Sequence, residues 1–170
     1  MDIVLLIARL LHIGAGVFWG GALIFMSRFL FPAVNDAGPA GGQVMSAMAN
    51  RGLTKAMPAA AIITVLAGIY LLYRVSAGFD NAYMGSGPGI TYSIGGMCAI
   101  IALILGATLV KSSFDKMLKL GASLQSTPEA ERGSIVNEMN AMRQKGVGAA
   151  RIVSVLIMIT VFCMAIGRYV

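Results

Sequence analysis

Four apolar stretches decide what this chain can fold into, because each is long enough to cross a lipid bilayer as a helix. They cover about residues 3–31, 57–73, 90–110 and 149–166. At about 1.5 Å per residue, roughly 20 helical residues span the ~30 Å of hydrocarbon in a membrane. Of the 170 residues, 58% are hydrophobic and only 12% are charged, which excludes a water-soluble globular domain. We therefore predict an all-α integral membrane four-helix bundle that forms a single transmembrane domain over residues 1–170.

The basic residues are unevenly shared between the two ends of the predicted bundle. Ten of the 13 Lys and Arg residues lie in or beside the first and third connections: Arg28, Arg51, Lys55, Lys111, Lys116, Lys119, Arg132, Arg143, Lys145 and Arg151. The other end has Arg9, Arg74 and Arg168. Because Lys and Arg collect on the cytoplasmic side, we expect a multi-pass protein of a bacterial inner (cytoplasmic) membrane with both termini in the periplasm. Since the charges flank apolar runs, their partner is the lipid bilayer and no nucleic acid is expected.

The first connection is rich in residues that interrupt helices. Residues 32–42 (PAVNDAGPAGG) include two prolines and three glycines, which predicts a loop. The stretch that follows, residues 43–54, carries Val44, Met45 and Met48, and we expect these side chains to lie along the membrane surface.

The third connection is the longest of the three, and it has the start signals of a helix. Ser126 or Thr127 offers an N-cap, and Pro128 suits the first helical position. We expect a helix from there to about Lys145. Together with the end of the third span, it would form a cytoplasmic helical hairpin that continues spans three and four.

Small residues are concentrated on the first three spans. The first span has a G-x-x-x-G pattern from Gly16 to Gly20, with Gly14 and Gly21 beside it. The second and third spans add Ala59, Ala60, Ala61, Ala67, Gly68, Gly95, Gly96, Ala99, Ala102 and Gly106. Helices associate in membranes where small residues let their backbones approach closely. These faces predict packing within the bundle or docking of other membrane subunits onto it.

His12 is the only histidine of the chain and one of few polar groups within a span. A polar side chain without a partner is costly in hydrocarbon, so its presence needs a reason. An imidazole can ligate haem iron or another metal, carry a proton, or simply hydrogen-bond in the bundle core. The sequence leaves these alternatives open.

Sulfur-containing residues are expected at the same membrane depth as His12. They form two pairs, Met97 with Cys98 on the third span and Cys163 with Met164 on the fourth. Imidazole, thiolate and thioether are the ligands that Cu(I) prefers. A metal site of His12, Met97, Cys98, Cys163 and Met164 is therefore one prediction, and ordinary apolar packing of the Met and Cys residues is the alternative.

The first span resembles the first helix of a group of small bacterial membrane proteins. Residues 9–21 read RLLHIGAGVFWGG, and residues 28–31 read RFLF. The group includes the membrane domain of copper-resistance protein D and the HemJ-type protoporphyrinogen oxidases, which are similar in the histidine and in the later tryptophan, here Trp19. Residues 55–72 resemble the next helix of the group. The resemblance implies a membrane haem protein in which His12 corresponds to a histidine proposed to ligate haem b.

Other reactive groups are scarce. No acidic residue clearly lies within a span, and the Ser-His-Asp set of a hydrolase cannot be assembled. We therefore expect a non-catalytic integral membrane subunit that packs against a larger electron-transfer complex of respiration or photosynthesis. The alternatives are a haem b-binding membrane oxidoreductase of the HemJ type that uses His12, and a copper-handling membrane protein.

Overall fold

The computed structural model describes residues 2–124 and 126–170, and it is built of helices. In chain order they are α1 (Ile3–Phe25), the π-helix η1 (Met26–Leu30), α2 (Phe31–Asp36), α3 (Pro39–Asn50), α4 (Leu53–Val75), α5 (Asn81–Met84), α6 (Gly87–Leu105), the π-helix η2 (Gly106–Lys111), α7 (Ser112–Leu124) and α8 (Glu129–Ile166). Several of them join without a break. The resulting rods that are long and apolar enough to cross a membrane are Ile3–Asp36, Leu53–Val75, Gly87–Leu124 and Glu129–Ile166. The predicted all-α architecture, with four helices able to span a membrane, is confirmed.

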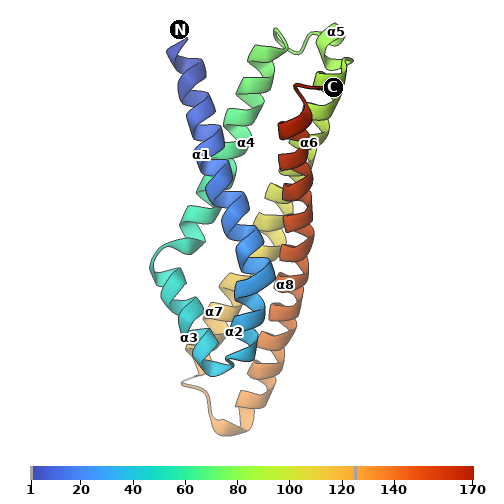
Figure 1. The fold of residues 1–170 in the computed structure, drawn as a ribbon. Helices are drawn as coiled ribbons and strands as arrows, with labels where there is room; N and C mark the ends of the chain where they lie inside the picture. The colour runs from blue at the N-terminus through green and yellow to red at the C-terminus, as the bar shows by residue number, and fades with distance from the viewer. Residues whose placement is uncertain (1, 125) are drawn as a thin grey trace.

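The four long rods lie side by side as two close pairs (Figure 1). α1 packs against α4, and α6 packs against α8, while fewer contacts join one pair to the other. Both ends of the chain lie at one end of the bundle in Figure 1, which we call the terminal end. α7 and the first half of α8 form a helical hairpin at the opposite end, which we call the hairpin end. The hairpin predicted between the third and fourth spans is therefore confirmed.

Small side chains fill the centre of the bundle. Ala102, Ala150 and Val153 are completely buried where the helix pairs meet. Trp19 packs beside them and has 7% of its surface exposed. Since lipid tails are as apolar as the core, the pairs are held by this close packing and by hydrogen bonds between helices.

The G-x-x-x-G motif of the first span packs inside the bundle. A Cβ atom on Gly16 would lie 3.3 Å from the Cγ2 atom of Thr64 on α4. One on Gly20 would lie 3.0 Å from the Cγ2 atom of Ile157 on α8. The two glycines thus let α1 lie close to α4, its partner in the first pair, and to α8 of the second pair.

The loop predicted for residues 32–42 is wrong, because most of this segment is helical. Pro39 lies in the first turn of α3, whereas Pro32 lies inside the unbroken rod Ile3–Asp36, directly after the π turns of η1. A first-turn proline costs little, since the backbone N–H it lacks is largely unused there. Only Ala37 and Gly38 form the turn, and Gly38 has the positive φ, 55°, that glycine adopts readily.

The surface position predicted for Met45 is also wrong. Its side chain is buried, with 5% exposed, whereas the neighbouring Val44 is exposed. α3 packs against α2 and α4, so one face of this short helix is covered.

The N-cap predicted for the last helix is wrong by a few residues. α8 begins at Glu129, and no side chain of the described residues caps it. The hydroxyl groups of Ser126 and Thr127 instead donate hydrogen bonds to the carbonyl oxygen of Ser123 in α7, at 3.0 and 2.8 Å. The two hydroxyls therefore complete the end of one helix rather than the start of the next.

A buried hydrogen bond joins the two helix pairs near mid-bundle and predicts a measurable coupling. The Oγ atoms of Ser27 and Ser154 lie 2.7 Å apart, and both residues are buried. Hydrogen bonds between membrane helices contribute about 0.6 kcal/mol on average and at most about 1.7 kcal/mol. We expect a double-mutant cycle of Ser27→Ala and Ser154→Ala, measured by unfolding in detergent, to give a coupling energy in this range. A coupling of zero would mean that the carbonyls of Ile24 and Ala150, which the two hydroxyls also contact, satisfy them equally well.

Candidate cofactor site

A large cavity lies between the helix pairs at the terminal end. It has a volume of about 850 Å³ and is lined by residues of α1, α4, α6 and α8. The lining is mainly apolar, and its polar side chains are those of Arg9, His12, Trp19, Thr64, Arg74, Tyr92, Ser93 and Thr160. Cofactor pockets typically have roughly 300–1,000 Å³ and a few polar groups on apolar walls. This terminal-end cavity therefore has the size and lining of a cofactor site.

His12 lines the terminal-end cavity from α1. Its Nδ1 atom lies 2.8 Å from the backbone carbonyl oxygen of Thr64 on α4. Because a carbonyl oxygen only accepts hydrogen bonds, Nδ1 carries the proton and donates it. In this tautomer the lone pair of the ring lies on Nε2, which is the atom that would bind a metal. Metal-ligating histidines commonly have this arrangement, in which a carbonyl or carboxylate holds the other ring nitrogen.

Gly68 makes room for this hydrogen bond. It lies one turn after Thr64 on α4, and a Cβ atom there would lie 2.8 Å from Cε1 and 3.0 Å from Nδ1 of His12. A larger residue would therefore push the imidazole away from α4. The Thr64 hydroxyl donates a hydrogen bond to the carbonyl oxygen of Ala60 at 2.7 Å. Thr64 therefore binds His12 through its main-chain carbonyl oxygen and not through its side chain.

Two arginines, Arg9 and Arg74, line the outermost part of the terminal-end cavity. Arg74 donates hydrogen bonds to the carboxylate of Asp2 at 2.6 Å and to the hydroxyl of Tyr70 at 2.9 Å. These contacts tie the start of α1 to the last turn of α4 and hold Arg74 beside the cavity. Guanidinium groups bind carboxylates through paired hydrogen bonds, so Arg9, which has no ion pair among the described residues, suits an acidic group of a cofactor.

The contact between Asp2 and Arg74 predicts that the folded protein loses stability as the pH falls into the acid range. The backbone N–H of Leu5 and then the Arg74 guanidinium lower the pKa of Asp2 from its ordinary value of 3.8. Ionised Asp2 therefore stabilises the fold above that value, and this contribution is lost as the pH falls through the lowered pKa. We expect Asp2→Asn, which keeps an N-cap, to lower the thermal midpoint slightly at neutral pH and to have no effect in strong acid. Asp2→Ala also removes the cap, so an equal loss for both variants at every pH would contradict the assigned ion pair.

The structure divides the other predicted metal ligands into two groups. Met97 on α6 and Met164 on α8 line the terminal-end cavity together with His12. Cys98 and Cys163 are outside that lining, and Cys163 packs against a glycine of α6. Among residues 2–124 and 126–170, no three His, Cys, Asp or Glu side chains are grouped closely enough to hold a metal ion. Ligation by His12 and the two methionines stays a prediction.

Two residues that position His12 were not identified from the sequence. Thr64 contributes a main-chain atom, which no side-chain pattern reveals. Gly68 is one of many small residues that predict helix packing. Their spacing of four residues places them on one face of α4, and this is the signal that could have marked that face as the partner of a polar residue.

Comparisons of the chain with protein-family models, with curated proteins and with solved structures found no match. The resemblance to the copper-resistance D and HemJ-type group therefore remains a prediction that rests on the first two spans.

Proposed function

We propose that this chain is a haem b-binding membrane oxidoreductase in which His12 would ligate the haem iron. The observation that carries the proposal is the hydrogen bond from His12 Nδ1 to the Thr64 carbonyl, beside the terminal-end cavity. It supports ligation because it fixes the tautomer and the orientation of the ring and leaves Nε2 available. His12 also lines the cavity, as a ligand of a bound cofactor would.

The residues of the terminal-end cavity suit a haem in size, polarity and charge. Its volume of about 850 Å³ lies in the range of cofactor pockets, and its walls are mainly apolar. Arg9 is placed to bind a carboxylate, whereas Arg74 is already paired with Asp2, and Met97 or Met164 would be a second ligand to the iron. Bound haem would supply one-electron oxidation and reduction. The residues of this chain would hold it, exclude water from it and neutralise its acidic groups.

We further propose that the terminal end faces the periplasm of a bacterial inner membrane. Of the 13 basic residues, only Arg9, Arg74 and Arg168 belong to this end by their position along the spans. The positive-inside rule then favours the hairpin end as the cytoplasmic one. In this orientation the cavity beside His12 would lie in the periplasmic half of the membrane.

An absorbance spectrum of the protein, purified gently from its native membranes, tests the proposed function. We expect a Soret band, and sharper bands of haem b at longer wavelength after reduction with dithionite. A native protein that is colourless in both states would refute haem binding.

A second candidate function is a non-catalytic subunit of a larger electron-transfer complex of respiration or photosynthesis. The glycines that face out of the bundle favour it. A Cβ atom on Gly14 or Gly21 of α1 would meet no atom within 4 Å. The two glycines lie seven residues apart, on one face of the helix, and such small residues admit a close-packed helix of another subunit. If the chain leaves its native membranes only as a lone monomer, without other subunits, this candidate fails.

A further inference from the structure

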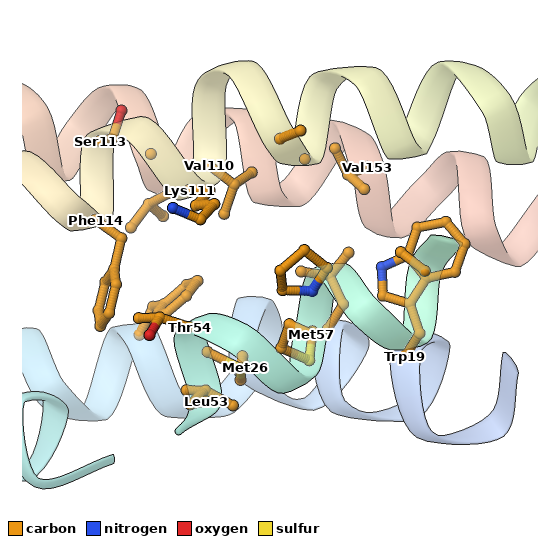
Figure 2. A pocket seen from close by; sticks show the side chains of 18 of the residues that line it. Trp19, Met26, Leu53, Thr54, Met57, Val110, Lys111, Ser113, Phe114 and Val153 are labelled. Atoms are coloured by element: carbon orange, nitrogen blue, oxygen red, sulfur yellow. The ribbon is translucent and has the colours of Figure 1, made fainter. Parts of the chain in front are cut away.

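A second cavity lies between the helix pairs toward the hairpin end, and the proposed haem site does not use it. This hairpin-end cavity has a volume of about 140 Å³ and is lined by residues of the stretch from α1 through α4, of the stretch from α6 through α7, and of α8. Figure 2 shows its walls, with Trp19 at one end and Phe114 toward the other. Its few polar side chains, apart from Trp19, are Thr54, Lys111, Ser113 and Arg143, and the rest of the lining is apolar.

The helices that line the hairpin-end cavity have irregular backbones. The π-helix η1 contributes Met26, and the π-helix η2 contributes Gly106 and its neighbours. α4 contributes Pro58, which lies inside the helix and leaves one turn without its hydrogen bond. π turns are frequent at functional sites, and internal prolines kink helices. The cavity is thus formed where three spans depart from regular helical geometry.

Trp19 presents a hydrogen-bond donor to this cavity. Its side chain is almost completely buried, and Figure 2 shows the indole nitrogen on the edge of the ring that faces Met57 and the cavity. Among the described residues, the hydrogen bonds between spans in the interior join His12 to Thr64, Ser27 to Ser154 and Thr160 to Gly95, so none of them uses the indole. The enclosed polar atoms without a partner among the described residues are Ser113 Oγ and Arg143 Nε, so the indole N–H is accessible and free to donate. A ligand with an oxygen at this position would supply an acceptor.

We propose that the hairpin-end cavity binds the head group of a membrane quinone, with one ring carbonyl oxygen accepting a hydrogen bond from Trp19 Nε1. An engineered apolar cavity of roughly 150 Å³ holds one benzene molecule, so a volume of about 140 Å³ suits a single six-membered ring. A lipid acyl chain would fill the same space but would leave the indole N–H without an acceptor, which disfavours it.

The quinone site is separate from the haem site and does not depend on it. Trp19 lines both cavities, and it follows His12 by two turns on α1, about 10 Å along the helix axis. A quinone hydrogen-bonded to Trp19 therefore lies close to any cofactor held by His12. The only residue of the terminal-end cavity that contacts the quinone in this proposal is Trp19.

Binding of decyl-benzoquinone to the purified protein in detergent tests this proposal, with decylbenzene as the matched ligand that lacks carbonyl groups. We expect equilibrium dialysis to show saturable binding of the quinone, with quenching of the fluorescence of Trp19, the only tryptophan. Trp19→Phe should weaken quinone binding about two- to tenfold, the usual effect of one hydrogen bond, and should not change decylbenzene binding. Equal quinone affinity for the wild type and Trp19→Phe would overturn the assignment.

A cavity-filling variant tests the location of the site. Gly106 lines the hairpin-end cavity, and a Cβ atom there would meet no atom within 4 Å, so Gly106→Leu should fold and occupy the space. Quinone binding should then be lost. Gly21→Leu is the matched control, because Gly21 is equally open but lies outside both linings, and it should bind quinone as the wild type does. Saturable binding that persists in folded Gly106→Leu would overturn the proposal.

The same variants separate this proposal from the proposed function. His12→Ala should leave quinone binding unchanged, since His12 does not line the hairpin-end cavity. Gly106→Leu should leave any Soret band in place, since Gly106 does not line the terminal-end cavity. Loss of the haem with retention of the quinone, or the reverse, therefore identifies which assignment fails.

Discussion

His12→Ala is expected to abolish the Soret absorbance of the protein. His12 is the only histidine, so no second imidazole can replace it. Its ring is held by the Thr64 carbonyl in the orientation and tautomer that leave Nε2 free beside the terminal-end cavity. The measurement is the ratio of haem to protein in wild type and variant, purified in parallel from the same host. A variant that keeps its full Soret band would refute His12 as the ligand.

Gly68→Ala tests the orientation of His12 without changing the imidazole. The added Cβ would lie 2.8 Å from Cε1 of the ring, so the ring must move away from Thr64. Loss of such a supporting contact typically weakens metal binding about 10–100-fold. Gly14→Ala is the control, because a Cβ on Gly14 meets nothing within 4 Å. If Gly68→Ala retains haem as well as Gly14→Ala does, the hydrogen bond to Thr64 is not what makes His12 a ligand.

The membrane architecture could be predicted because hydrophobicity alone determines which segments can lie in lipid. The four apolar stretches correspond to the four long helices, and three of the small residues predicted to pack, Ala60, Ala61 and Ala102, belong to the core. The loop predicted for residues 32–42 is wrong because the effect of a proline on a helix depends on its position in that helix. Pro39 lies in the first turn of a helix and Pro32 directly follows π turns within one, and composition alone distinguishes neither position from a loop.

The candidate site could be predicted only in part. His12 was found because a polar residue in a span is rare and costly. The residues around it depend on how each helix is rotated about its axis, which the sequence does not reveal. That rotation brings Met97 and Met164 to the cavity and leaves Cys98 and Cys163 outside its lining. It also decides that Trp19 lines both cavities.

The adjacent glycines Gly95 and Gly96 are expected to respond oppositely to alanine. Gly95 is buried where α6 meets α8, and a Cβ atom there would lie 2.8 Å from Cβ of Cys163 and 3.2 Å from Cε of Met164. The Cβ of Cys163 is fixed to its backbone, so the helices themselves must separate. Gly95→Ala should therefore lower the free energy of unfolding by about 1–3 kcal/mol, the usual cost of overpacking. Unfolding in mixed detergent micelles measures it.

Gly96→Ala makes the same chemical change one residue later, where a Cβ atom would meet nothing within 4 Å. Alanine is a better helix former than glycine by up to roughly 1 kcal/mol, so this variant should be as stable as the wild type or slightly more so. The separation of α6 from α8 in Gly95→Ala should also stretch the hydrogen bond from the Thr160 hydroxyl to the Gly95 carbonyl, now 3.0 Å. Removing that bond beforehand with Thr160→Val should then reduce the cost of Gly95→Ala. Equal stability of the two alanine variants would mean that α6 and α8 do not pack at Gly95, and the wall of the terminal-end cavity formed by these helices would have to be redrawn.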